Sequence, residues 1–287
     1  MNQAPDAVSP AGPCVDLQVH STASDGALPP AEVVRHAHRI GLVAMALTDH
    51  DTLAGLDEAR AAAAPLGLRV IAGVELSTDW HGRELHILGL HVRETAWLED
   101  RLRDIRDARR DRAALIVERL GALGIALTMD DVLRETHGAS LGRPHIARAM
   151  IARGYVTDLR QAFDKYLGAG KPAFVEKEKL DAAAAIALLH EAGALAVWAH
   201  PGRLGTQDLV KPLAKAGLDG LEVLHPGHSP DDRARLFMLA ERHALLLSGG
   251  SDWHGQFEGP RQLGNQQVPL AWLAAQDRRV AERAVPA

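Results

Sequence analysis

Short apolar runs recur along most of the chain, and amphipathic stretches of helical length separate the majority of them. Seven such runs predict strands, at residues 15–20, 42–48, 69–75, 84–90, 194–199, 220–224 and 245–250. The run at 42–48 does not alternate between apolar and polar positions, which is typical of a parallel strand buried on both faces. Strands that alternate with helices predict an α/β fold with a barrel-like sheet.

One pair of predicted strands departs from this alternation. Residues 78–83, between the third and fourth strands, are polar, and His81-Gly82 is a turn sequence. This connection is too short for a crossover helix. We therefore expect strands 69–75 and 84–90 to form an antiparallel hairpin.

The pattern changes between residues 94 and 179, where no convincing parallel strand occurs. This segment predicts helices instead, at residues 98–123, 129–135, 144–153 and 158–167. The arginine-rich run 101–112 alternates with acidic residues at helical spacing, which is typical of a solvated helix face. We expect residues 14–93 and 180–287 to form the barrel and residues 94–179 an inserted helical cap, with residues 1–13 as a loose leader.

Composition narrows the choice of partners. The formal net charge of −5 provides no overall basic surface, which argues against binding along a long duplex nucleic acid. The single Cys14 excludes an intramolecular disulfide, and the chain has neither a secretory signal pattern nor an apolar run of membrane-spanning length. We therefore expect a soluble, cytoplasmic protein with a small partner and no membrane contact. The oligomeric state stays open.

Polar residues that can bind metals or substrates follow several of the predicted strands. In barrels of this kind the active site lies at the carboxyl ends of the strands. The residues found at these ends are His20, Thr48-Asp49-His50, Glu75, His200, His225 and Asp252. Any one of them alone would more often be a surface or hydrogen-bonded residue. Imidazoles and carboxylates together, however, suit Zn, Mn or Fe, and one carboxylate can bridge two ions. The combination predicts a metal site.

Six ordered motifs resemble those of the PHP (polymerase and histidinol phosphatase) superfamily. They lie at residues 16–25, 48–51, 73–75, 85–89, 199–201 and 251–254, and the resemblance runs from about residue 14 to 256. It implies a distorted seven-stranded (β/α)7 barrel that holds two or three divalent metal ions, with Mn as the first choice and Zn, Fe or Mg as alternatives. It also implies one ligand set for each ion: His20, Glu75, Asp252 and the residue at position 18; Glu75, His86 and His200; and Asp25, His50 and His254.

Position 18 departs from the family's pattern. The first motif is normally His-x-His, whereas this chain has Gln18-Val19-His20. The carbonyl oxygen of Gln18 is a poorer ligand than imidazole for Zn or Mn. The first ion could be bound more weakly, it could be lost while the others sustain catalysis, or the chain could be a natural or engineered variant of low activity. We favour weakened but retained metal binding, because the other ligand positions are filled.

The resemblance implies phosphoester hydrolysis, in which bridging metals activate a water and neutralise phosphoryl oxygens. A phosphate also needs protein cations. Arg143 and Lys171 in the predicted cap and Arg203 after His200 are the candidates, and the alternative for each is a solvated or structural charge. His228 could donate to the substrate or protonate the leaving oxygen, or could simply pack at the start of a helix.

A helical cap between the fourth and fifth strands resembles one branch of the superfamily. That branch contains nucleoside 3′,5′-bisphosphate phosphatases and 5′→3′ exoribonucleases that act on short RNAs. The implied substrates are therefore small phosphorylated nucleotides or short RNA. Histidinol phosphate is the alternative substrate, and the alternative class is a degenerate metal-binding module without turnover, weakened by Gln18.

Overall fold

The computed structural model describes residues 13–136, 141–176 and 180–284. The predicted leader, apart from Pro13, lies outside the described residues, and so do residues 177–179 at the end of the predicted cap. The strands are β1 Cys14–Val19, β2 Ala44–Leu47, β3 Arg69–Trp80, β4 Arg83–Leu90, β5 Leu195–Trp198, β6 Gly220–Leu224, β7 Leu246–Gly249 and β8 Val268–Pro269. The helices are α1 Pro30–Arg39, α2 Leu56–Ala63, α3 Thr95–Ala122, α4 Met129–Arg134, α5 Arg143–Ala152, α6 Leu159–Ala162, α7 Ala182–Glu191, α8 Gln207–Lys215, α9 Pro230–Arg242 and α10 Leu270–Ala284, with short turns η1 Ala64–Leu66, η2 Phe163–Leu167 and η3 Gly202–Leu204.

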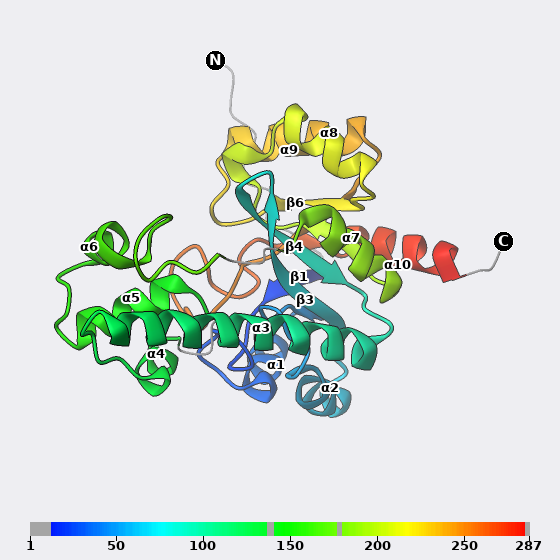
Figure 1. The fold of residues 1–287 in the computed structure, drawn as a ribbon. Coiled ribbons are helices and arrows are strands. Elements are labelled where there is room, and N and C mark those ends of the chain that lie inside the picture. Colours follow the sequence, from blue (N-terminus) through cyan, green and yellow to red (C-terminus); the bar gives the residue numbers. More distant parts are fainter. Residues whose placement is uncertain (1–12, 137–140, 177–179, 285–287) are drawn as a thin grey trace, which may run out of the picture.

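The eight strands of the described residues form one sheet in the order β7-β6-β5-β4-β3-β2-β1-β8. The sheet curls until its two sides meet, because Val19 at the end of β1 bridges Trp253 just after β7. The two segments pass so closely there that a Cβ on Gly250 would lie 2.6 Å from the backbone nitrogen of Gln18. The result is an α/β fold with a nearly closed, barrel-like sheet (Figure 1).

The seven predicted strands are all present, and β8 is an addition. It has two residues and pairs antiparallel with β1, so it leaves no hydrophobic run in the sequence. The distortion of the (β/α)7 pattern lies at β4, which runs antiparallel to both β3 and β5. The remaining neighbours among β1–β3 and β5–β7 are parallel.

The predicted hairpin is confirmed, but it is longer than expected. Its two-residue turn is His81-Gly82, with φ of 51° and 85°, and two positive φ values in succession match the twist of the flanking strands. Residues 78–80 and 83 belong to β3 and β4, so the prediction of a polar connection over 78–83 is wrong except at the turn itself.

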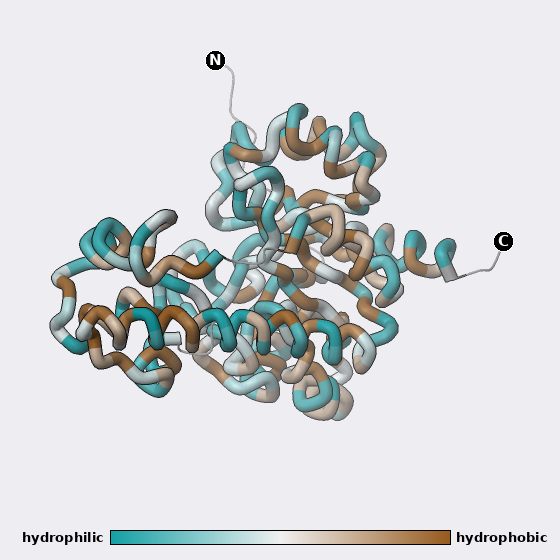
Figure 2. The backbone as a smooth tube through the Cα atoms, in the orientation of Figure 1, coloured by the Kyte–Doolittle hydropathy of each residue, from teal (hydrophilic) through white to brown (hydrophobic). Residues whose placement is uncertain are grey.

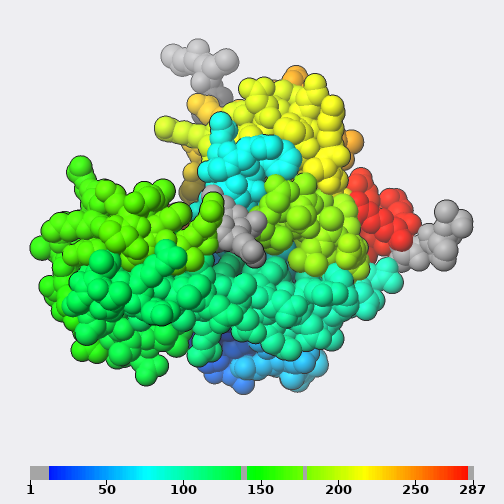
Figure 3. Space-filling model, viewed as in Figure 1, coloured from blue at the N-terminus to red at the C-terminus, as the bar shows by residue number. Residues whose placement is uncertain are grey.

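The helices from the second half of α3 to η2 share a hydrophobic cluster of their own. Its buried members include Ile116, Leu120, Val132, Ile146 and Met150, and none of them belongs to the clusters around the sheet. In the space-filling view this part of the chain, in green, forms a lobe at one side of the molecule (Figure 3). The division of the chain into a barrel and a cap at residues 94 and 179 stays a prediction.

Helix α3 joins the lobe to the barrel. Apolar and polar residues alternate along its length (Figure 2), and its buried Leu98 and Leu102 pack in the cluster around the sheet. The prediction of a solvated face over 101–112 is wrong for the arginines that point at the barrel. Arg109 forms an ion pair with Asp51, and Arg106 donates to the Asp51 carbonyl at 2.5 Å. No helix of the described residues is both long and apolar enough to cross a bilayer.

The Arg109–Asp51 pair generates a stability prediction. Arg109 is 8% exposed and Asp51 is fully buried, with φ of +54° directly after His50. Arg109→Ala would leave a buried carboxylate without its cation, which costs about 3–5 kcal/mol. We expect a loss of this size in urea unfolding. Arg110→Ala, at an exposed neighbouring position, should change stability by less than about 0.5 kcal/mol. Equal effects of the two substitutions would contradict the role given to Arg109.

Candidate metal centre

Histidines and carboxylates converge at the end of the barrel where the parallel strands finish. Among the described residues, three groups of possible ligands have atoms within 4.8 Å of one another: His20, Asp25, His50 and His254; His50, Glu75 and His86; and His20, Glu75 and Asp252. The structure thus brings together the side chains that the sequence motifs indicated, although these are spread over more than 230 residues.

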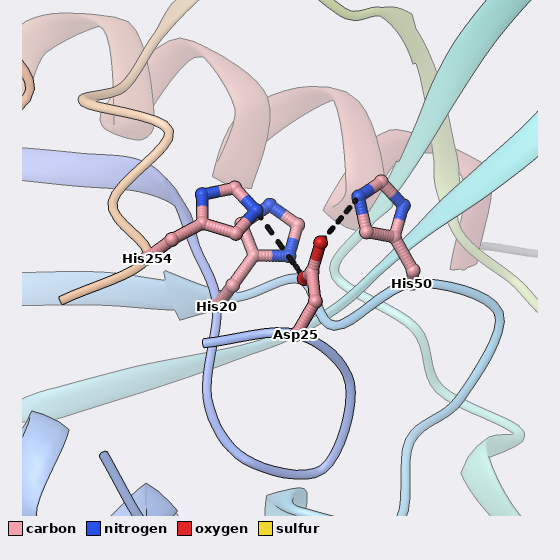
Figure 4. A group of neighbouring side chains, drawn as sticks. All are labelled: His20, Asp25, His50 and His254. Atoms are coloured by element: carbon pink, nitrogen blue, oxygen red, sulfur yellow. Dashed lines mark ion pairs between the residues drawn. The ribbon is translucent and has the colours of Figure 1, made fainter. Parts of the chain in front are cut away.

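Asp25 lies at the centre of the first group (Figure 4). Its Oδ1 is 3.2 Å from Nε2 of His254 and 3.7 Å from Nδ1 of His20, and its Oδ2 is 3.8 Å from Nε2 of His50. Burial opposes ionisation of Asp25, but the hydrogen bond from His254 and the charges of His50 and His20 outweigh it and lower its pKa to about 2. The carboxylate form required of a metal ligand is therefore favoured.

Glu75 lies at the centre of the other two groups. Its Oε1 is 2.6 Å from Nδ1 of His86 and 2.9 Å from Nε2 of His200, while its Oε2 is 3.1 Å from Nε2 of His20. With one oxygen facing each side, this buried carboxylate has the arrangement of a bridging ligand. Burial opposes its charge, but the surrounding histidines hold its pKa well below the usual range. The prediction that Glu75 ends its strand is wrong: β3 continues to Trp80, and Glu75 pairs with Leu88 in mid-strand.

Asp252 divides its oxygens between two sides of the site. Oδ1 is 3.3 Å from Nε2 of His20, whereas Oδ2 contacts His225 Nε2 at 3.4 Å and is ion-paired with Arg261. Sequence reasoning placed His225 at a strand end without giving it a role and missed Arg261 altogether. Arg261 lies in the long segment between β7 and β8, where no periodic pattern marks it.

Two other aspartates of the motifs hold the backbone instead of facing the ligands. Both oxygens of Asp49 accept hydrogen bonds from Ser21, and Oδ1 also accepts one from Ser24, at 2.6–2.7 Å, which fixes the turn that carries Asp25. Asp16 accepts from the backbone nitrogens of Ser251 at 3.0 Å and Gly264 at 2.8 Å, which ties β1 to the segment that carries Asp252.

Strained backbone marks the same end of the barrel. His200 and Asp252 have φ of +33° and +51°, a region that residues other than glycine seldom occupy. The backbone nitrogen of His200 donates to Oε2 of Glu222 at 2.7 Å. Burial, together with the nearby carboxylates of Asp252 and Glu75, raises the pKa of Glu222 well above its usual range. Glu222 therefore holds His200 in a conformation that its own backbone preference would not select.

Gln18 is oriented by Glu75. Its Nε2 donates to Glu75 Oε2 at 2.9 Å, and its Oε1 has no hydrogen-bond partner among the described residues although the side chain is fully buried. An unsatisfied buried acceptor costs about 1–3 kcal/mol. Rotating the amide by half a turn would place its oxygen against the carboxylate, which is unfavourable. Glu75 therefore keeps the neutral carbonyl oxygen, and not the NH₂ group, as the atom at position 18 that is available to coordinate a metal ion.

The donor set fits divalent cations. Within the part of the chain that the structure describes, both nitrogens of buried His20, Nδ1 of His50 and Oε1 of Gln18 lack hydrogen bonds of acceptable geometry. Three carboxylates and five histidines surround these atoms within a small volume, and nitrogen with carboxylate oxygen is the mixture that Mn, Fe and Zn accept. A bound cation would satisfy polar atoms that the protein leaves unpaired.

A cavity of about 410 Å³ opens over these ligands. Its walls are His50, Glu75, His86, His200, Gly202, His225, Gly227, His228, Asp252, His254 and Arg261. The predicted substrate cations Arg143, Lys171 and Arg203 do not line it. Arg143 instead donates to the Leu167 carbonyl at 2.9 Å and lies over the rings of Phe163 and Phe174.

His228 lines the cavity, but both of its ring nitrogens are in use. Nδ1 bonds to the carbonyl of Val223 at 2.9 Å, and Nε2 accepts the N–H of Gly202 at 3.1 Å. Burial lowers the pKa of His228 to about 4. In this geometry His228 is a neutral imidazole that fixes the turn after His200, and it has no free N–H for a leaving oxygen.

The state of Gln18 generates a prediction about metal affinity. Gln18→His replaces a neutral carbonyl oxygen by an imidazole beside Glu75, so the first ion should bind at least about tenfold more tightly. Calorimetric titration of the metal-free protein with Mn²⁺ measures this change. Gln18→Ala is the matched control and should not tighten binding. Unchanged affinity in Gln18→His would show that position 18 does not face an ion.

Comparison with known proteins agrees with this geometry. The model of the PHP domain matches residues 16–118. A 3′,5′-nucleoside bisphosphate phosphatase of Chromobacterium violaceum is 39% identical over 261 residues, covering 88% of this chain and 91% of that protein. A 5′-3′ exoribonuclease of Haemophilus influenzae is 40% identical over 249 residues, covering 83% and 89%.

Solved structures share the fold over nearly the whole chain. A protein of Bifidobacterium adolescentis described as a metal-dependent phosphoesterase superposes with a TM-score of 0.74 at 33% identity, covering 96% of this chain and 98% of that one. An amidohydrolase of Chromobacterium violaceum, solved with bound sulfate and no metal, gives a TM-score of 0.69 at 36% identity, covering 94% and 96%. With its six motifs, its barrel-like sheet and these relatives, the chain belongs to the PHP domain family.

Proposed function

We propose that the chain is a metal-dependent phosphoesterase. Its substrate would be the 3′-phosphate of a nucleoside 3′,5′-bisphosphate, or the 5′-terminal nucleotides of a short RNA. The observation that carries the proposal is the position of Glu75, a buried carboxylate with histidine nitrogens on both of its oxygens, in the wall of an open cavity. The phosphatase and the exoribonuclease at 39% and 40% identity support this class of substrate.

Two or three divalent ions would occupy the ligand groups, with Mn as the proposed metal and Zn, Fe or Mg as alternatives. His20, Glu75 and Asp252 with Gln18 would hold one ion, Glu75, His86 and His200 a second, and Asp25, His50 and His254 a third. Bound ions would supply Lewis acidity to the phosphoryl group and acidify a water for attack. The chain's own contribution is to keep the carboxylates ionised and to fix the histidines at strand ends or, for His86, within β4.

The remainder of the substrate would extend beyond the cavity. We propose that residues 94–179 form a cap on a barrel of strands β1–β7, and that Arg143, Lys171 and Arg203 contact those parts of a nucleotide that do not fit between the ligands. Guanidinium groups bind phosphate through paired donors, which suits the second phosphate of a bisphosphate. We do not assign a general acid, because the nitrogens of His228 are occupied.

Parallel measurement of metal content and phosphate release tests the proposal. The metal-loaded protein should release phosphate from nucleoside 3′,5′-bisphosphates or 5′-nucleotides from short 5′-phosphorylated RNA, with far lower kcat/KM on histidinol phosphate. Faster turnover of histidinol phosphate would overturn the proposed substrate. Stoichiometric metal without release from any of these phosphoesters would overturn the enzymatic function itself and favour a metal-binding module without turnover.

A further inference from the structure

Arg261 is the one arginine or lysine among the described residues that lines the cavity. The cavity is lined by candidate metal ligands and also by five residues outside the ligand groups: Gly202, His225, Gly227, His228 and Arg261. Among the described residues, Arg261 is therefore the one Lys or Arg side chain that a phosphoryl group placed against the ligands could meet inside the cavity. Its position follows from the path of the chain from β7 to β8, which returns past Asp252.

The guanidinium of Arg261 has donors to spare. Its Nη1 makes the ion pair with Oδ2 of Asp252 and lies 3.3 Å from the Asp252 carbonyl. No hydrogen bond in the part of the chain that the structure describes uses its Nε or Nη2, and the side chain is 41% exposed. One nitrogen is thus anchored on Asp252 while the others are open to a ligand. Phosphate, with oxygens that accept two parallel N–H groups, matches this fork.

His225 presents a second donor beside Arg261. The side chain is 5% exposed, and its Nδ1 accepts the N–H of Gly227 at 3.0 Å. In the neutral ring the proton is then on Nε2, which faces Asp252 Oδ2 at 3.4 Å, a long contact. A donor held by its own loop and only weakly engaged can transfer its hydrogen bond to a ligand oxygen at little cost.

Asp252 lies between these two N–H donors and the candidate metal ligand His20. Its Oδ1 faces His20, while Oδ2 faces both Arg261 and His225. The same carboxylate can therefore serve as a ligand on one side and hold two N–H donors in place on the other. The donors are thereby preorganised close to where negative charge develops during phosphoryl transfer.

We propose that Arg261, assisted by the Nε2–H of His225, binds the phosphoryl group that is hydrolysed. This inference rests on the proposed phosphoesterase function. It adds Arg261, which neither motif pattern nor strand position indicated, and gives a role to His225, which the sequence placed only at a strand end. Because the contact is to the reacting phosphate, it applies to every phosphoester substrate. A cap contact such as that proposed for Arg143 would instead affect only substrates with a second phosphate.

Arg261→Ala and Arg261→Lys test the inference. Arg261→Ala should lower kcat/KM by at least about tenfold for both a nucleoside bisphosphate and a simple aryl phosphate. The inhibition constant of inorganic phosphate should rise by a similar factor, and metal content should stay at the wild-type level. Arg261→Lys should recover part of the loss, because it restores the charge without the fork. Arg242→Ala, at an exposed position on α9, is the matched control and should change none of these quantities.

Two results would overturn the inference. If Arg261→Ala lost bound metal and excess metal restored full activity, Arg261 would only position Asp252. If the aryl phosphate were hydrolysed normally, Arg261 would not contact the reacting phosphate. Should the wild-type protein hydrolyse nothing, calorimetric titration of the metal-loaded protein with inorganic phosphate keeps the inference testable, since Arg261→Ala should still weaken that binding about tenfold and unchanged binding would refute it.

Discussion

The contact of the buried Glu75 carboxylate with the surrounding histidines is the interaction on which the rest of the site depends. Glu75 is fully inaccessible to solvent, and an isolated charge at such a position would be very costly. Contacts from His20, His86 and His200 compensate for this cost, and among the described residues no Lys or Arg forms an ion pair with Glu75. A carboxylate surrounded by imidazoles can be stable in a core and still accept a metal ion, because neutral imidazoles are themselves ligands.

The fold brings these three imidazoles to Glu75 from different strands. His20 lies at the end of β1, and His200 lies just beyond β5. His86 lies near the start of β4, and because β4 runs antiparallel to β5, its start is at the same end of the barrel as the ends of the parallel strands. Closure of the sheet between β1 and β7 then adds Asp252. Outside this shell, Arg109, Glu222 and Asp49 fix the backbone of the ligand-bearing turns. Rigid support of this kind is what metal sites require of their surroundings.

Much of the fold and of the candidate metal site could be predicted from the sequence. Short apolar runs predicted the seven strands, and motif residues at or near their ends indicated the candidate ligands. The place of Glu75 within β3 could not be predicted, because the strand continues through polar residues such as Ser77 and Asp79 that are held by pairing with β4. Burial of Arg109 could not be predicted either, since its helical pattern resembles that of exposed neighbours and only the position of Asp51 distinguishes it. Arg261 lies in a segment without periodicity, so its approach to Asp252 is known only from the fold.

Metal stoichiometry after substitution of Glu75 tests the central claim most directly. Glu75→Gln preserves the size of the side chain and removes its charge. Elemental analysis after dialysis against Mn²⁺ should show at least one ion fewer per chain than in the wild-type protein, while circular dichroism shows the same secondary structure. A Glu75→Gln protein that retains the full wild-type content of metal would contradict the account, because Glu75 would then hold the histidines together without holding an ion.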